Sequence, residues 1–100
     1  LEATPRDIDM AALSGEIAKV PGVKGVHDIH IWTIGSGRRA LSAHVLTDDI
    51  TTRQGQEIAC RIRAVLAGTF SITHTTLEME CDSCLSPSCE YVLRQGDLNI

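Results

Sequence analysis

Hydrophobic residues recur at helical spacing in two stretches of the chain. The first stretch follows Thr4-Pro5, which suits a helix start because threonine can cap the first turn and proline fits the first helical position. It ends at Pro21-Gly22, and the second stretch runs from about Thr52 to Ala67, with Gly68 as its expected stop. The two apolar stripes are Met10, Leu13, Ile17 and Val20, and Ile58, Ile62, Val65 and Leu66. Each predicted helix therefore presents one apolar face to a core.

Three strands are predicted between and after these helices. Residues 26–34 and 39–46 are rich in aliphatic and β-branched residues and are separated by Gly35-Ser36-Gly37, a pattern typical of an antiparallel hairpin. Residues 71–80, rich in threonine and isoleucine, form the third strand. Because each helix has a single apolar stripe, both must cover the same sheet face. We therefore predict an α+β fold, a ferredoxin-like α-β-β-α-β sandwich without its first strand, with two helices on one face of a three-stranded sheet.

Alternation along the strands predicts that polar side chains gather on the sheet face that the helices leave open. The residues assigned to this face are Asp28, His30, Trp32, His44, His74, Glu78 and Glu80. Strict alternation assigns His27 to the covered face with Ile29 and Ile31, but at the start of its strand it could reach round the edge toward His44. Such a face is either hydrated or matched to a partner.

Imidazole and carboxylate groups together suit Zn²⁺, Co²⁺ or Cd²⁺ better than Mg²⁺, which prefers oxygen ligands alone. Taken singly, each of these residues is also consistent with a hydrated strand face, and Asp28 with orienting a ligating histidine. The prediction of a metal site rests on their convergence. Trp32 is either a core anchor or a contact between two copies of the chain, and we predict the dimer interface.

Three cysteines lie close together after the last predicted strand, as Cys81-x-x-Cys84 followed by Cys89. Two thiolates at this spacing can bind one Zn²⁺, and Cys89 can supply a third sulfur. A fourth ligand would have to come from a histidine, a glutamate or another chain. The alternative is a set of free or redox-active thiols, although a thioredoxin-type motif would precede a helix and this one precedes Leu85-Ser86-Pro87. Cys60 is predicted to be a small buried residue of the second helix.

Length, charge and the absence of certain motifs exclude several classes of protein. With 100 residues the chain is expected to form a single domain, with a core at about residues 4–81 and a cysteine-containing tail at 82–100. Its formal charge of −4 argues against a nucleic-acid groove and a polybasic membrane patch. No apolar run approaches the roughly 20 residues that span a bilayer. Catalytic motifs are absent, so we expect no enzyme, and the abrupt start without Met indicates a piece of a longer protein.

Several consecutive motifs carry a family resemblance. The segment VPGVKGVHDIHIWTI at residues 20–34, followed by Ser36-Gly37 and LSAHV at residues 41–45, resembles the cytoplasmic C-terminal domain of cation diffusion facilitator transporters. The segment HTTLEME at residues 74–80 is similar to the last strand of that domain. The resemblance covers about residues 4–81 and is closest to bacterial cobalt-zinc-cadmium resistance exporters.

The resemblance implies a function and a set of ligands. The parent would be an antiporter of the bacterial inner membrane that exports Zn²⁺ and similar ions, with this domain on the cytoplasmic side beside its transmembrane domain. The domain would form a homodimer and bind metal at and near the dimer interface. Binding would bring the paired protomers closer and thereby promote export. His27 and His44 match imidazole ligands of the family, and Glu80 falls at a carboxylate ligand. Glu78 stands where some members have histidine, and Glu57 falls at another ligand-bearing position. The cysteine tail resembles zinc-binding tails of some members.

Three other functions are compatible with parts of the sequence. A stand-alone metallochaperone would use Cys81 and Cys84, but proteins of that class place Cys-x-x-Cys in the first loop before a helix. A small redox enzyme would use the same two thiols and would need one of them to have a depressed pKa. An amino-acid-binding regulatory domain is supported only by the similarity of its fold.

Overall fold

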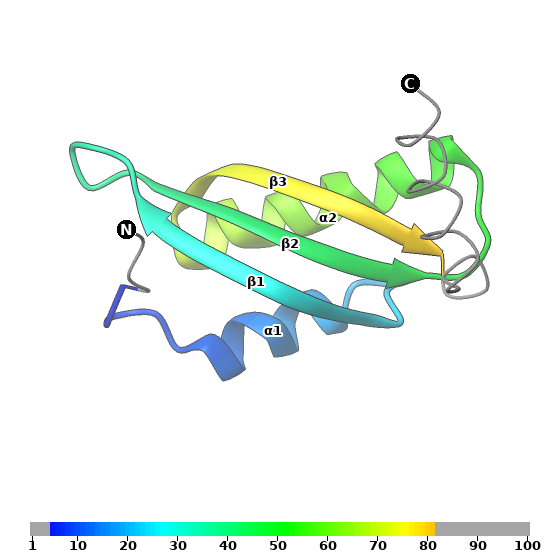
Figure 1. Cartoon of the computed structure of the whole chain (residues 1–100), viewed down its shortest axis with the longest axis horizontal. Helices are drawn as coiled ribbons and strands as arrows, with labels where there is room; N and C mark the ends of the chain where they lie inside the picture. The colour runs from blue at the N-terminus through cyan, green and yellow to red at the C-terminus, as the bar shows by residue number, and fades with distance from the viewer. Residues whose placement is uncertain (1–4, 82–100) are drawn as a thin grey trace, which may run out of the picture.

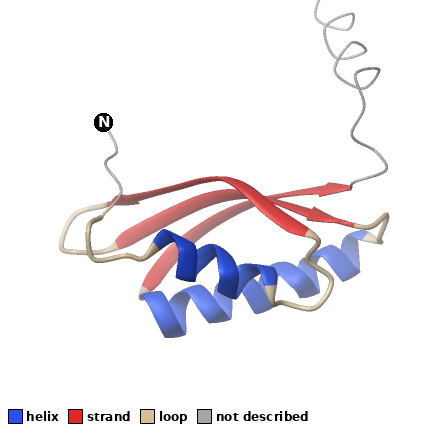
Figure 2. Ribbon diagram, turned by 90° about the horizontal axis from the view of Figure 1, so that it is seen from below, coloured by secondary structure: helices blue, strands red, loops and turns tan. Residues whose placement is uncertain are grey.

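The computed structural model describes residues 5–81, and its elements follow the predicted order. The elements are α1 (Met10–Ala18), β1 (Gly25–Thr33), β2 (Arg39–Thr47), α2 (Thr52–Phe70) and β3 (Ile72–Cys81). Both helices lie on one face of the three-stranded sheet, which confirms the predicted sandwich (Figures 1 and 2). Within residues 5–81 no helix is both long and apolar enough to cross a membrane.

The sheet has the order β1-β2-β3, with β2 in the centre. β1 and β2 pair antiparallel, which confirms the predicted hairpin. Its turn requires positive φ at Gly35 (50°), Ser36 (51°) and Gly37 (75°), a conformation that glycine adopts without steric cost. β3 runs parallel to β2, because the chain returns through α2 before it joins the sheet.

The core lies between the helices and the covered face of the sheet. Leu13 and Ile17 of α1 and Ile62 and Leu66 of α2 are fully buried, which confirms the two predicted apolar stripes. The sheet contributes the alternate residues Ile31, Leu41, Ala43 and Val45. Burial of each large aliphatic side chain contributes about 1.5–3 kcal/mol, so this layer supplies most of the stabilisation. The helices cover only this face, and the opposite face is left for polar side chains.

The predicted helix ends were wrong at three places, and one of them is the end of α1, which comes at Ala18 before Pro21-Gly22 is reached. The first helix begins at Met10, not at Thr4-Pro5, because the Asp9 carboxylate caps the helix by accepting from the amides of Ala11 and Ala12 at 3.0 and 3.1 Å. Thr4 itself lies outside the described residues. The second helix continues through Gly68 to Phe70, which packs against the core. It ends where Ser71 adopts φ 56° and its amide donates to the carbonyl of Leu66.

The predicted burial of Cys60 was also wrong, since this residue is exposed. Cys60 is two positions from both Ile58 and Ile62, which is about 200° around the helix at 3.6 residues per turn. It therefore lies on the outer side of α2, opposite the buried stripe.

Candidate metal centre

A β-bulge in β1 decides which of its polar residues share a face. His27 pairs with His44 and His30 pairs with Ser42, so Asp28 and Ile29 together lie opposite the single residue between them on β2. Asp28 takes φ 54°, a left-handed conformation that aspartate tolerates better than most residues. The extra residue resets the alternation, so His27 and His30 both lie on the open face. Strict alternation was therefore wrong in assigning His27 to the covered face.

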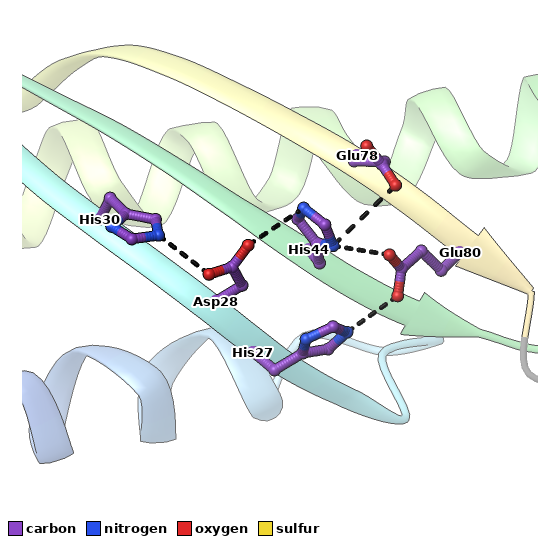
Figure 3. A network of polar contacts seen from close by, with 6 residues as sticks. All are labelled: His27, Asp28, His30, His44, Glu78 and Glu80. Atoms are coloured by element: carbon purple, nitrogen blue, oxygen red, sulfur yellow. Dashed lines mark hydrogen bonds and ion pairs between the residues drawn. The ribbon is translucent and has the colours of Figure 1, made fainter.

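Three ligand-type side chains from three different strands meet on this face. His27 lies on β1, His44 is its direct partner on β2, and Glu80 lies near the end of β3 (Figure 3). His27 Nε2 is 2.8 Å from Glu80 Oε1, and His44 Nδ1 is 2.6 Å from Glu80 Oε2. The two imidazole rings meet edge to face with centroids 5.1 Å apart. Two ring nitrogens and one carboxylate oxygen all lie within 4.8 Å of one another.

The electrostatics of this cluster favour a bound cation. The Glu80 side chain is only 11 % exposed. The hydrogen bond with His27 lowers the pKa of Glu80 most strongly, burial opposes this, and the contact with His44 lowers it further. Glu80 is therefore an ionised carboxylate at neutral pH. It lies in a largely buried position beside two imidazole rings.

His44 Nδ1 is the atom that most directly tests whether a metal fits. It is buried and no hydrogen bond from a described residue satisfies it, although Glu80 Oε2 lies 2.6 Å away. A buried nitrogen without a hydrogen bond costs free energy unless its lone pair is used. Metal coordination uses that lone pair, and a site of two imidazoles and a carboxylate suits Zn²⁺, Co²⁺ or Cd²⁺. The residues present therefore fit a transition-metal ion.

Asp28 lies beside the cluster and contacts two histidines. Its Oδ1 is 2.9 Å from His30 Nε2, and its Oδ2 is 3.4 Å from His44 Nε2. The hydrogen bond with His30 is the main cause that lowers the pKa of Asp28, so this residue is also a carboxylate at neutral pH. A carboxylate near Nε2 favours the His44 tautomer with its proton there, which leaves Nδ1 free to bind metal. Asp28 thus has the geometry to orient His44.

Glu78 and His74 are placed at increasing distance from the cluster. Glu78 is opposite His44, but its side chain is 65 % exposed and its Oε2 is 3.9 Å from His44 Nδ1. His74 pairs with Ala40, about 13 Å along the strand from His44 at 3.3 Å per residue. The Arg38 Nη2 group donates to His74 Nε2 at 2.9 Å, a partner that sequence reasoning missed. Arg38 lies in the hairpin turn and His74 on β3, so no periodic pattern in the sequence indicates their contact.

The other candidate residues are not part of this cluster. Trp32 is half-buried on the open face, opposite Ala40. Glu57 is exposed on α2, on the other side of the sheet. Cys81 is half-buried and directly follows Glu80 at the end of β3. Cys84, Cys89 and the remaining tail lie outside the described residues, so the cysteine site stays a prediction.

Comparison with known proteins places the chain in a family. The family model for the cytoplasmic domain of cation efflux proteins matches residues 5–81. The metal cation efflux system protein CzcD of Cupriavidus metallidurans is 38 % identical over 84 residues, which are 84 % of this chain and 26 % of that protein. A cadmium, cobalt and zinc/H(+)-K(+) antiporter of Bacillus subtilis is 37 % identical over 84 residues, covering 83 % of this chain and 27 % of the antiporter.

A solved structure supports the same family assignment. The metal-bound C-terminal domain of the CzcD transporter from Cupriavidus metallidurans superimposes with a TM-score of 0.65 at 37 % identity, covering 73 % of this chain and 99 % of that one. The chain spans about a quarter of the length of the curated relatives it matches. These matches confirm the family resemblance seen in the His-Asp-x-His-x-Trp motif, and the matched family is one of cation efflux proteins, not of enzymes. The chain belongs to the family of cation efflux protein cytoplasmic domains.

Proposed function

We propose that this chain is the metal-sensing and dimerisation domain of a zinc, cobalt or cadmium exporter. A divalent ion held by His27, His44 and Glu80 stabilises a closed homodimer, and the closed form promotes export by a transmembrane domain of the same transporter. The single observation that carries the proposal is the convergence of these three side chains from three strands. The relatives named as cadmium, cobalt and zinc antiporters support the choice of metals.

Charge on the open face supplies the physical basis of the switch. Each protomer presents the carboxylates of Asp28, Glu78 and Glu80 on this face, so two such faces repel each other when they approach. A divalent ion offsets that repulsion, and its remaining coordination position is available to water or to a group of the second copy. The half-buried Trp32 on the same face supplies apolar contact area for the dimer.

The switch requires the ion to bind the closed dimer more tightly than the open one. Each tenfold preference shifts the equilibrium by about 1.4 kcal/mol, and the two symmetric sites of a homodimer multiply the effect. A hundredfold preference at each of the two sites would therefore supply about 5.5 kcal/mol in total. That is enough to convert a mostly open population to a mostly closed one. The domain would thus respond over a narrow range of metal concentration.

Zinc calorimetry on the reduced, metal-free chain tests the proposal. To separate the two predicted sites, the measurement uses a chain in which Cys81, Cys84 and Cys89 are replaced by serine. We expect one tight site per chain that is lost in the His27→Ala/His44→Ala variant. His74→Ala is the matched control, because this histidine lies on the same face but outside the cluster. Small-angle scattering should show zinc-dependent compaction of a dimer only where the site is intact.

Two results would contradict the proposal. Unchanged zinc stoichiometry in the His27→Ala/His44→Ala variant would remove these residues from the site. Zinc binding weaker than about 10 μM, roughly −7 kcal/mol, would leave the domain as a passive dimer contact.

A further inference from the structure

A second feature lies on the side of the sheet that faces the helices. A pocket of ≈ 420 Å³ opens between the first turns of α2 and the last residues of β3. These two segments lie on the same side of the molecule (Figure 1). Its apolar wall includes Ile50, Ala59, Leu77 and Met79. Ligand pockets in proteins have volumes of about 300–1,000 Å³, so this α2–β3 pocket can hold several side chains.

The apolar wall of the α2–β3 pocket is incompletely covered by the described part of the chain. Leu77 and Met79 pack against the core but are only half-buried. Gly55 lines the pocket, and a Cβ there would meet nothing closer than Ile50 Cδ1 at 3.9 Å. Glycine within a helix costs about 1 kcal/mol relative to alanine. Neither a clash nor a positive φ requires glycine at residue 55, and the missing side chain leaves this part of the pocket unfilled.

The charges at the rim are unbalanced. Asp48 pairs with Lys24 at 3.1 Å, and Glu80 is held by the two histidines of the metal centre. The guanidinium of Arg63 also lines the pocket and has no ion pair among residues 5–81. An occupant with an acidic group next to an apolar surface would therefore complement this pocket.

A segment of this composition begins at the rim of the pocket. Cys81 lines the pocket and is directly followed by residues 82–100. That segment carries three carboxylates against one arginine, and its one run of three consecutive apolar residues is Tyr91-Val92-Leu93, directly after Glu90. Ten residues at about 3.3 Å each give Tyr91 ample reach to return to the pocket. Because the segment is part of the same chain, its effective concentration near the pocket is in the millimolar range.

We propose that the α2–β3 pocket is the docking site of the chain's own segment 82–100. Tyr91-Val92-Leu93 enters between α2 and β3, and Glu90 pairs with Arg63. The docked segment covers Met79 and the edge of the strand that carries Glu80. This docking requires no bound metal and stands independently of the proposed metal sensing, although Glu80 of the metal centre also lines the pocket.

The two methionines of the chain make the test specific. Met79 lines the pocket, and Met10 lies on α1, away from it. In the reduced and metal-free chain of residues 1–100, labelled with ¹³C at the methionine methyl groups, we expect nuclear Overhauser contacts from the Met79 methyl to the Tyr91 ring. Replacing Tyr91, Val92 and Leu93 together by serine should shift the Met79 resonance and abolish these contacts. The Met10 resonance is the internal reference and should not move.

Variants in the pocket test the same contact from the other side. Gly55→Leu fills the pocket and should displace the segment, and Arg63→Glu should weaken its docking by placing a like charge beside Glu90. Arg61→Glu is the matched control, since Arg61 is exposed on the same helix but does not line this pocket. Both pocket variants should move the Met79 resonance toward its position in the triple-serine variant, and the control should not.

Three results would overturn the proposal. The first is a Met79 resonance that does not respond to the triple-serine substitution and shows no contact with residues 82–100. The second is contact that disappears on dilution and appears between labelled and unlabelled copies, which would assign the pocket to a second chain. The third is contact from Met79 to protons that do not belong to the chain, which would indicate a co-purified small molecule.

Discussion

Gly22, in the turn between α1 and β1, is the position where a single added carbon should reveal how tightly this turn packs against Ile58 of α2. Its φ is 95°, and a Cβ built there would lie 2.7 Å from Ile58 Cδ1 and 3.2 Å from Ile58 Cγ1. Gly22→Ala therefore combines two unfavourable terms. An alanine held at positive φ costs about 1–2 kcal/mol, and the steric overlap adds about 1–2 kcal/mol, at the lower end of overpacking costs because the end of the Ile58 side chain can move.

The expected loss in the free energy of unfolding is thus about 2–4 kcal/mol. For a domain of this size, that loss lowers the melting temperature by roughly 8–30 °C. Urea unfolding followed by circular dichroism measures the loss, and Gly25→Ala is the matched control. Gly25 has no positive φ and nothing within 4 Å of its built Cβ, so we expect a change within about 0.5 kcal/mol.

A double-mutant cycle with Ile58→Ala separates the two terms. Ile58→Ala alone removes a buried side chain and should cost about 2–5 kcal/mol. In that background Gly22→Ala should retain only the cost of its positive φ, so the two substitutions should be less than additive by about 1 kcal/mol. If Gly22→Ala costs no more than Gly25→Ala, the inferred backbone conformation is wrong. If the two losses are fully additive, the contact with Ile58 is wrong.

Three further predictions concern the open face and α2. Glu80→Gln should lower the free energy of unfolding at pH 6 but not below the folded-state pKa of Glu80, because a lowered pKa gives stability that is present above the ordinary value of 4.5 and is lost as the pH falls through the folded-state value. Denaturation of both chains across this pH range measures the difference in free energy, and a difference that does not change with pH would contradict the prediction. Asp28→Asn keeps a residue that tolerates positive φ but weakens the orientation of His44, so calorimetry should show a loss of zinc affinity of roughly 10–100-fold. The loss in His30→Ala should be smaller, and equal losses would argue against the orienting role of Asp28. Cys60 should react with maleimide in the folded chain, as mass spectrometry after brief labelling can show, and protection until unfolding would contradict its exposed position.

Features that depend on local periodicity could be predicted from the sequence. The stripes around Leu13 and Ile62 identified the helices, and the glycine turn identified the hairpin. The covered face of β2 followed from simple alternation of Leu41 with its neighbours. Helix ends were less predictable, because several residues near each end can cap it. Asp9 rather than Thr4 begins α1, and Ser71 rather than Gly68 ends α2.

The candidate ligands were identified partly from the family resemblance and partly from the tertiary structure. The family resemblance pointed to His27, His44 and Glu80, and the structure brings these three side chains together. Alternation alone would have separated His27 from the others, because the bulge at Asp28 depends on pairing with β2 and leaves no periodic signal. The place of the cysteine tail in the function stays a prediction.

The sequence by itself determined the elements, the covered face and the chemical types available on the open face. These follow from residues that are neighbours along a helix or strand, where the repeat of the backbone sets which side chains share a side. Only the tertiary structure decided that His44 meets Glu80, which is 36 residues further along and reaches it after the α2 crossover. That meeting depends on the parallel register of β2 and β3, with Leu46 opposite Glu80. Long-range register of this kind is set by packing of the whole core and by backbone hydrogen bonds between distant strands, which no local pattern encodes.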